Sequence, residues 1–241
     1  MPDQPFYAIG DIHGRDDLLR GLIDQIHLDA TQRGHAPTIV FLGDMVDRGP
    51  AASQVLATVR DHIETYPGSS ALAGNHEEML LEFLDDPADT GLRWLKHGGL
   101  ETLNSFGIDP LRGDLDVDAL LAVSDALMQA LGNDRPGSTV HWLRNLPTQW
   151  VSGNVHCVHA GMDPDRAPDS QPRSVLLWGC PTFLRQTRTD GMWVVHGHTV
   201  VPDSVAASGR ISIDTGAYRS GVLTAAAIDP TGDVRFMQET V

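Results

Sequence analysis

Short apolar runs alternate with helical patterns over the first third of the chain. Each apolar run ends in a glycine followed by a polar residue, as expected for a buried strand that ends in a turn. The runs occupy residues 6–9, 38–42 and 70–73, and the helical patterns between them occupy residues 16–27 and 51–66. This order predicts β-α-β units, in which parallel strands are joined by helices.

Polar residues follow these predicted strands directly. Asp11 comes after the first run, Asp44 after the second and Asn75 after the third. The carboxyl ends of parallel strands lie at one edge of a sheet, where the functional groups of such folds collect. We therefore expect these three side chains to converge, although they are far apart in sequence.

The rest of the chain divides into a helical part and a strand-rich part. Residues 77–146 are predicted to be mainly helical, with short turns at residues 85–89 and 132–137. Strand patterns return at residues 155–158, 193–195, 211–213 and 222–228, and residues 162–173 are predicted to be irregular. We predict a single α/β domain over residues 1–241, with a helical insertion at about residues 78–146.

Composition narrows the possible partners and locations. Hydrophobic residues make up 41% of the chain, and the formal net charge is −15, which argues against binding to nucleic acid or anionic membranes. No signal peptide is evident, and no apolar stretch reaches the roughly 18 residues of a membrane span. Cys157 and Cys180 form no CxxC pattern. We expect a cytoplasmic protein, in which any anion site is locally positive.

Five short motifs combine Asp, His and Asn with glycines that allow sharp turns. In chain order they are GDIHG at residues 10–14, GDMVDRG at 43–49, GNHE at 74–77, VHAG at 158–161 and VHGHT at 195–199. A single motif of this kind is more often an ordinary turn after a strand. Five in this order indicate a site for two metal ions, since these side chains suit Mn²⁺, Fe²⁺ or Zn²⁺.

The order of these motifs resembles that of the calcineurin-like metallophosphoesterases. Within them it is similar to the bacterial branch of the PPP-type serine/threonine protein phosphatases. The resemblance extends from Phe6 to about Ile228. It implies a metallophosphoesterase fold, a central β-sandwich flanked by helices, with metal ions at the strand ends.

The resemblance also implies which residues bind two divalent ions. One ion would be held by Asp11, His13 and Asp44, and the other by Asp44, Asn75, His159 and His198. Asp44 would bridge the two ions through its two carboxylate oxygens. We expect Mn²⁺, and Fe and Zn are also compatible with these ligands.

The implied mechanism is direct attack of water on phosphorus. Water or hydroxide that bridges two cations has its pKa lowered toward neutrality and can attack at pH 7. Arg48 can bind the phosphate bidentately. His76 would protonate the leaving alkoxide, and Asp47 would orient His76 and stabilise its charge.

One departure from the family pattern concerns phosphate binding. Similar bacterial sequences carry a second phosphate-binding arginine shortly after a Leu-Trp pair, whereas this chain has Cys180 there. Arg185 and Arg188 are candidates to replace that arginine. His196 is expected to be a polar neighbour of the site, and Asp214 is expected to orient a ligand histidine.

Two substrate classes remain open. The first is a phosphorylated protein or peptide, cleaved at phosphoserine or phosphothreonine. The alternative is a nucleotide or other phosphorylated small molecule, as in the symmetrical diadenosine tetraphosphatases, which share most of the motifs. Those enzymes typically have alanine in place of Asp47 and aspartate in place of Glu77, so this sequence favours the protein phosphatase. A scaffold that binds no metal would need a lost ligand, and none is missing.

Overall fold

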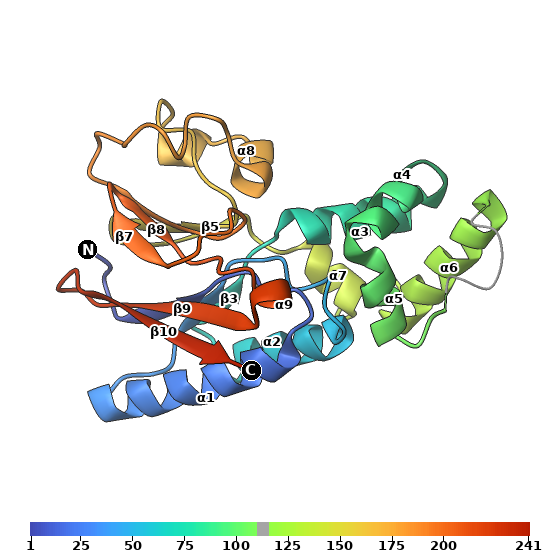
Figure 1. The fold of residues 1–241 in the computed structure, drawn as a ribbon, viewed down its shortest axis with the longest axis horizontal. Helices are drawn as coiled ribbons and strands as arrows, with labels where there is room; N and C mark the ends of the chain where they lie inside the picture. The colour runs from blue at the N-terminus through green and yellow to red at the C-terminus, as the bar shows by residue number, and fades with distance from the viewer. Residues whose placement is uncertain (110–115) are drawn as a thin grey trace.

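The computed structural model describes residues 1–109 and 116–241, and it stacks two five-stranded sheets between layers of helices (Figure 1). The first sheet has the order β10-β9-β1-β2-β3, with bounds β1 (Phe6–Ile9), β2 (Ile39–Phe41), β3 (Ser70–Ala71), β9 (Val222–Ile228) and β10 (Val234–Thr240). The second has the order β4-β5-β6-β8-β7, with bounds β4 (Gln149–Ser152), β5 (Val155–Val158), β6 (Trp193–His196), β7 (Val205–Ala207) and β8 (Arg210–Ser212). This is the α/β sandwich that the motifs imply.

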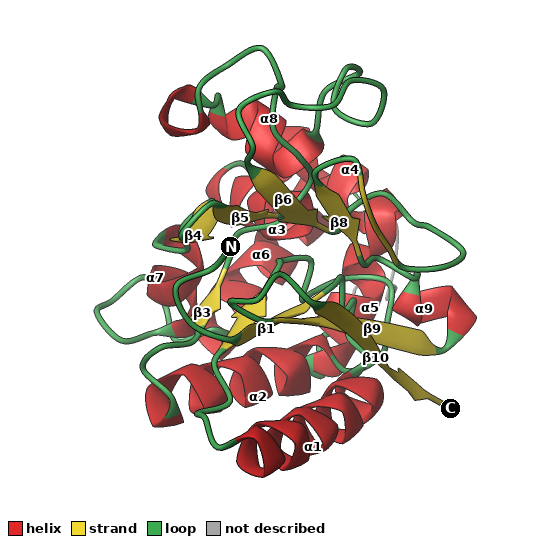
Figure 2. Ribbon diagram, turned by 90° about the vertical axis from the view of Figure 1, so that its left-hand side faces the viewer, coloured by secondary structure: helices red, strands yellow, loops and turns green. Residues whose placement is uncertain are grey.

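Helices cover both outer faces of the sandwich (Figure 2). The first sheet is covered by α1 (Asp16–Arg33) and α2 (Ala52–Thr65), and the second by α8 (Arg173–Trp178). A short helix, α9 (Ala217–Ser220), precedes β9, and a 3₁₀ turn occupies Pro168–Ser170.

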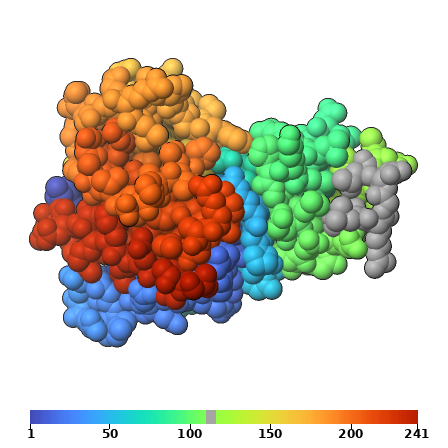
Figure 3. Space-filling model, viewed as in Figure 1, coloured from blue at the N-terminus to red at the C-terminus, as the bar shows by residue number. Residues whose placement is uncertain are grey.

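After β3, α3 (Asn75–Asp85) leads into a group of helices that we call the helical segment. It comprises α4 (Pro87–Trp94), a π-helical turn (Leu95–Gly99), α5 (Leu100–Ser105), α6 (Val117–Ala130) and α7 (Thr139–Arg144). In the space-filling view it forms a green lobe beside the body of the molecule (Figure 3). Helices fill most of the described part of residues 77–146, as the sequence predicts.

The alternation of side chains in β1 shows why its sequence is apolar throughout. Phe6 and Ala8 pack between the two sheets, while Tyr7 and Ile9 pack against the helices beneath the first sheet. A third apolar cluster lies between the second sheet and α8. A strand that is buried on both faces needs a continuous apolar run, which is what the sequence contains.

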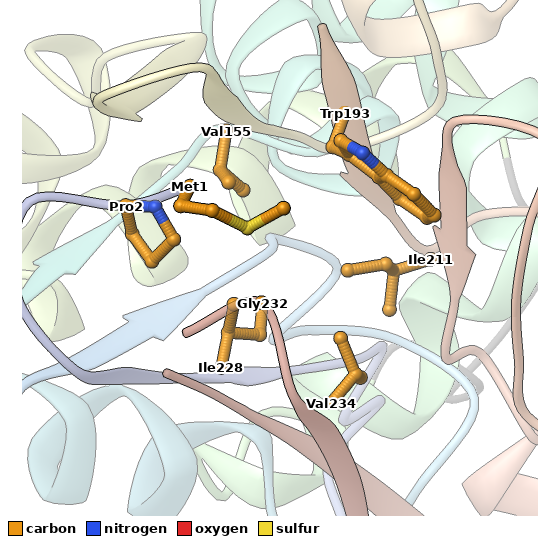
Figure 4. A pocket seen from close by; sticks show the side chains of 8 residues that line it. All are labelled: Met1, Pro2, Val155, Trp193, Ile211, Ile228, Gly232 and Val234. Carbon is orange, nitrogen blue, oxygen red and sulfur yellow. The ribbon is translucent and has the colours of Figure 1, made fainter. Parts of the chain in front are cut away.

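A small apolar pocket of about 30 Å³ lies between the sheets at the amino ends of β1, β5 and β6 (Figure 4). It is lined by Met1, Pro2, Val155, Trp193, Ile211, Ile228, Gly232 and Val234. The side chain of Met1 points into it (Figure 4). The polar motifs follow the opposite, carboxyl ends of these strands, so this pocket belongs to the packing of the sandwich.

The predicted strand pairing is confirmed, but some element bounds differ. β1 pairs in parallel with β2, and β2 with β3. Helix α1 continues beyond His27 to Arg33, where Gly34 in the left-handed conformation ends it. The irregular loop predicted to end at Arg173 instead meets α8 at that residue. In the described ranges, no helix is long and apolar enough to cross a bilayer.

Candidate active site

The six predicted ligand residues gather where strands of both sheets end. Asp11 and His13 follow β1, Asp44 follows β2, Asn75 opens α3 after β3, His159 follows β5 and His198 follows β6. All are buried except His198, which is partly buried. Segments far apart in the sequence therefore meet at one point, as the strand pattern predicts.

Asp44 lies at the centre of this cluster. Its Oδ1 is 3.3 Å from His159 Nε2, and its Oδ2 is 3.4 Å from His13 Nε2. On the His159 side, Asn75 Oδ1 lies 2.9 Å from His159 Nε2 and 2.8 Å from His198 Nδ1. Two groups of side chains thus share Asp44, with one carboxylate oxygen facing each group.

Two of these histidines direct a nitrogen lone pair at oxygen atoms. His13 Nδ1 donates a hydrogen bond to the carbonyl of Val46 at 2.8 Å, and His159 Nδ1 donates to that of Leu42 at 2.9 Å. With the proton on Nδ1, each Nε2 presents a lone pair to Asp44. Two lone pairs repel one another unless a cation lies between them. The donor set therefore fits divalent metal ions.

The charges of the cluster also fit a bound cation. Burial lowers the pKa of His13 to about 3 and that of His198 to about 4, so both imidazoles are neutral at pH 7, the form that binds metals. Burial, together with the charges of Asp214 and Asp44, raises the pKa of Asp11 well above its usual range. A cation among these carboxylates would remove this repulsion.

The loops that carry the site have a strained backbone. Seven non-glycine residues in the described ranges have a positive φ. Five of them are the predicted site residues His13, Asp44, Asp47, Arg48 and His198. Such conformations cost free energy and persist only where surrounding contacts hold them.

Glu77 supplies such contacts for the loop that carries Asp44. Its Oε2 accepts hydrogen bonds from the backbone N–H groups of Asp44 and Gly74, both at 2.8 Å. Its Oε1 accepts from Met45 at 2.8 Å and from Val46 at 3.3 Å. One buried carboxylate therefore ties the loop after β2 to the start of α3. The GNHE motif does not reveal this contact, because it depends on how the loop after β2 packs against α3.

His76 and Asp47 form a buried pair beside the cluster. His76 Nδ1 lies 2.6 Å from Asp47 Oδ2. Trp94 Nε1 donates to the Asp47 carboxylate at 3.1 Å, and Thr102 Oγ1 donates to Asp47 Oδ1 at 2.7 Å. Burial opposes protonation of His76, but the carboxylates of Asp44 and Asp47 raise its pKa. The helical segment thus holds the carboxylate that orients His76.

The position of His76 is compatible with two roles. Together with His13 and Asp44 it forms a group that is close enough to hold a metal ion. However, its Nδ1 is bonded to Asp47, and its Nε2 accepts a hydrogen bond from Arg48 at 3.0 Å. Because the carboxylates of Asp44 and Asp47 raise the pKa of His76 and so favour the protonated imidazole, which cannot bind a metal ion, its contacts fit a residue that transfers protons better than a metal ligand.

Arg48 lies between the cluster and solvent. Its Nη1 donates to His13 Nε2 at 3.1 Å, while its Nη2 contacts His76. The Arg48 guanidinium carbon also lies 4.8 Å from the centre of the Tyr218 ring, a cation–π contact that helps to hold it in place. In the sequence, only the position of Tyr218 shortly after Asp214 could have indicated this contact.

Two other predicted neighbours of the site make different contacts. His196 Nε2 lies 2.7 Å from Ser212 Oγ, and its Nδ1 lies 3.0 Å from the carbonyl of Gly197. His196 belongs to neither of the groups in the described ranges that lie close enough together to hold a metal ion. Asp214 Oδ1 accepts a hydrogen bond from the N–H of Gly216, and no hydrogen bond joins Asp214 to a histidine in the described ranges. The charge of Asp214 nevertheless reaches the cluster, since it helps to raise the pKa of Asp11.

The two candidates for the missing arginine lie in different surroundings. Cys180 lines a pocket of about 290 Å³ that also includes His198. The Arg188 side chain is almost fully buried and is held by Asp190 and by backbone carbonyls. Arg185 is exposed and does not line this pocket. The contacts of Arg188 direct its side chain away from this pocket, and Arg185 remains a prediction.

The family assignment rests on a match along most of the chain. The model of the calcineurin-like phosphoesterase family matches residues 4–202. The chain belongs to this family. The fold and the cluster of Asp, His and Asn at the strand ends agree with that membership.

Relatives of this chain are named for two activities. A symmetrical bis(5'-nucleosyl)-tetraphosphatase of Aromatoleum aromaticum is 29% identical over 74% of this chain, which spans only 55% of that relative. An asymmetrical bis(5'-nucleosyl)-tetraphosphatase of Halalkalibacterium halodurans is 25% identical, over 91% of this chain and 88% of its own. Serine/threonine-protein phosphatase 1 of Salmonella typhimurium is 33% identical over 39% of this chain and 38% of its own.

Solved structures share the fold. A protein serine/threonine phosphatase of Saccharomyces cerevisiae aligns over 100% of this chain and 81% of its own, with a TM-score of 0.57 and 14% identity. A cold-active protein-tyrosine phosphatase of Shewanella aligns over 99% of this chain and 83% of its own length, with a TM-score of 0.56 and 18% identity. PPP-type phosphatases are thus among the structural neighbours of this chain.

Proposed function

We propose that the protein hydrolyses phosphoserine and phosphothreonine esters in phosphorylated proteins or peptides, using two divalent metal ions. The observation that carries this proposal is the buried contact of 2.6 Å between His76 Nδ1 and Asp47 Oδ2. A serine alkoxide has a high pKa and needs a proton in order to leave, and an Asp–His pair can supply that proton.

The residues that would hold the ions are those that the motifs indicate. Asp11, His13 and Asp44 would bind one ion, and Asp44, Asn75, His159 and His198 would bind the other. Bound ions would neutralise phosphoryl oxygens and lower the pKa of water toward neutrality. We expect Mn²⁺ to be the most effective ion, because the donors mix carboxylate, amide and imidazole.

The other site residues would bind the phosphoryl group and transfer a proton. Arg48 would bind two phosphoryl oxygens through its two terminal nitrogens. The contact with the Tyr218 ring would help to hold the guanidinium in place. In its protonated form, His76 would donate the Nε2 proton to the leaving oxygen in place of its contact with Arg48, while Asp47 accepts from Nδ1–H and stabilises the imidazolium.

Metal removal and replacement tests the proposal. The metal-free protein should not turn over a phosphoserine peptide, and added Mn²⁺ should restore turnover more effectively than Mg²⁺, Zn²⁺ or Fe²⁺. Turnover in the presence of a chelator, with no metal detected in the protein, would contradict the role of the cluster.

A second candidate is the hydrolysis of dinucleoside tetraphosphates, which is favoured by the names of two relatives. A nucleotide that leaves from a phosphoanhydride has a low pKa and needs little protonation, so this reaction does not account for the Asp47–His76 pair. The same assay should include diadenosine tetraphosphate. If its kcat/KM exceeds that of every phosphopeptide by about tenfold or more, this second candidate replaces the first.

A further inference from the structure

A second pocket opens beside the cluster, on the side of Arg48. It has a volume of about 370 Å³ and is lined by Arg48, Lys96, His97, Gly98, Glu101 and Tyr218. Arg48 also contacts His13 and His76, so its guanidinium belongs both to the pocket and to the cluster. A ligand in the pocket would therefore lie next to a phosphoryl group bound at the cluster.

The backbone around Lys96 is held against Arg48. Lys96 lies in the π-helical turn Leu95–Gly99, a type of turn that is frequent at functional sites. Gly98 in this turn has a φ of 112°, and its carbonyl accepts a hydrogen bond from the Arg48 N–H at 3.1 Å. A Cβ at Gly98 would lie 2.6 Å from the Arg48 nitrogen, so this approach requires glycine.

Lys96 is the only lysine of the chain, which has 17 Lys and Arg residues against 32 Asp and Glu. Its side chain is exposed and takes part in none of the salt bridges found within the described ranges. The pocket lining carries positive charges on Arg48 and Lys96 and a negative charge on Glu101, so its net charge at pH 7 is +1. The protein as a whole has a net charge of −15, so this positive charge is not part of a generally basic surface. It fits an anionic ligand.

We propose that this pocket, the Arg48–Lys96 subsite, binds a second phosphoryl group of the substrate that is not itself cleaved. Lys96 offers a point charge with three donors, and the guanidinium of Arg48, which would bind the scissile phosphoryl group, adds its positive charge to the pocket. His97 adds one ring nitrogen, because within the described ranges only its Nδ1 has a partner, the carbonyl of Arg93. The inference rests on the proposed function, since the scissile phosphoryl group must lie at the cluster.

This subsite narrows the substrate class to compounds with neighbouring phosphoryl groups. Two sources have that chemistry: a peptide with adjacent phosphoserines, and the oligophosphate chain of a nucleotide. A substrate with one isolated phosphoryl group would use the cluster and Arg48 without Lys96. The two kinds of substrate should therefore respond differently to the loss of the lysine.

Calorimetric titration of the Mn²⁺-loaded protein tests the subsite directly, with tripolyphosphate and orthophosphate as probes at a fixed concentration of free Mn²⁺. We expect Lys96→Gln to weaken tripolyphosphate binding about tenfold, the effect of losing one charged hydrogen bond, and orthophosphate binding by less than about twofold. Lys96→Arg should retain binding. Arg135→Gln, which removes one charge from an exposed position outside this pocket, is the matched control and should have no effect. No loss in Lys96→Gln, or an equal loss for both probes, overturns the inference.

Turnover of p-nitrophenyl phosphate separates this inference from the proposed function. It carries one phosphoryl group, so Lys96→Gln should lower its kcat/KM by less than about twofold, far less than the loss in tripolyphosphate binding. If the wild type is active but Lys96→Gln binds tripolyphosphate as tightly as the wild type, the proposed subsite is wrong and the proposed function stands. If the wild type is inactive with every metal but binds tripolyphosphate through Lys96, the proposed function alone is wrong. To identify the source, a doubly phosphorylated peptide and diadenosine tetraphosphate are each tested as competitors of tripolyphosphate binding. If neither compound competes, the inference is overturned.

Discussion

The strand ends and the helical segment build the candidate site in different ways. Five of the six predicted ligand residues follow strands directly, and Asn75 opens the helix after β3. Their positions are set by backbone geometry and by backbone hydrogen bonds, such as those to Glu77. The helical segment carries no predicted ligand. It contributes Trp94 and Thr102, which hold Asp47, and Lys96 and Gly98, which lie against Arg48.

This difference suggests that the two regions have separate roles. Substitutions at the strand ends should remove metal binding and with it all activity. Substitutions in the helical segment should leave the metal ions in place and change how well the protein protonates the leaving group or binds phosphate. Substitutions in each region test whether metal binding and turnover can be changed separately.

The largest effect is expected at the strand ends. Asp44→Asn removes the charge of the carboxylate shared by both groups of ligands. We expect activity to fall by more than about 100-fold, beyond the effect typical of residues that only support a ligand, and metal content to fall as well. Metal analysis and phosphatase assays check this. Asp24→Asn, an exposed carboxylate on α1, is the control. An Asp44→Asn protein with full metal content and activity would refute the two-metal arrangement.

A smaller effect is expected from Trp94→Phe. It removes the N–H donor to Asp47 but keeps an aromatic ring against Phe83, where the two ring centres lie 4.6 Å apart. We expect kcat for a phosphoserine peptide to fall about tenfold, because a hydrogen bond to a buried carboxylate is lost. Metal content should not change. Trp142→Phe, in α7, is the matched control. Loss of metal in Trp94→Phe would show that the two regions are not separable.

The smallest effect on activity is expected from Gly98→Ala. The new Cβ would meet the backbone of Arg48, and the residue would keep a left-handed φ. We expect a loss of roughly 1–3 kcal/mol in unfolding free energy and a raised KM for p-nitrophenyl phosphate. Gly107 also has a positive φ, of 73°, and nothing lies within 4 Å of a Cβ added there, so Gly107→Ala should lose stability without a change in KM. Equal KM values for the two variants would mean that the contact with Arg48 is unimportant.

The same contrast explains what the sequence could predict. Each strand-end residue follows an apolar run, so its position at the edge of a sheet can be inferred locally. Trp94 and Thr102 lie in helices whose sequence does not reveal which loop they will touch, and only the docking of those helices brings them to Asp47. Lys96 likewise needs the turn at Gly98 to reach Arg48, and no short motif indicates that turn.

The missed elements have similar causes. Strand β10 is a polar edge strand, and its pairing with β9 is clear only from the turn at residues 229–233. Helix α1 continues past His27 because Ala30 still packs into the core, and Gly34 could have indicated its end. Asp214 lies near the cluster as expected, but a turn within its own loop takes its hydrogen bond, which the sequence does not reveal.

The central claim is that the Asp47–His76 pair protonates an alkoxide leaving group, and the most direct test compares two substrates with His76→Asn. A serine alkoxide needs a proton, whereas nitrophenolate leaves without one. We expect kcat/KM for a phosphoserine peptide to fall by about 10²–10⁴-fold, and that for p-nitrophenyl phosphate to fall far less. Metal content should be measured in the same preparations and should equal that of the wild type. Equal losses on both substrates, with the metal ions retained, would contradict the account.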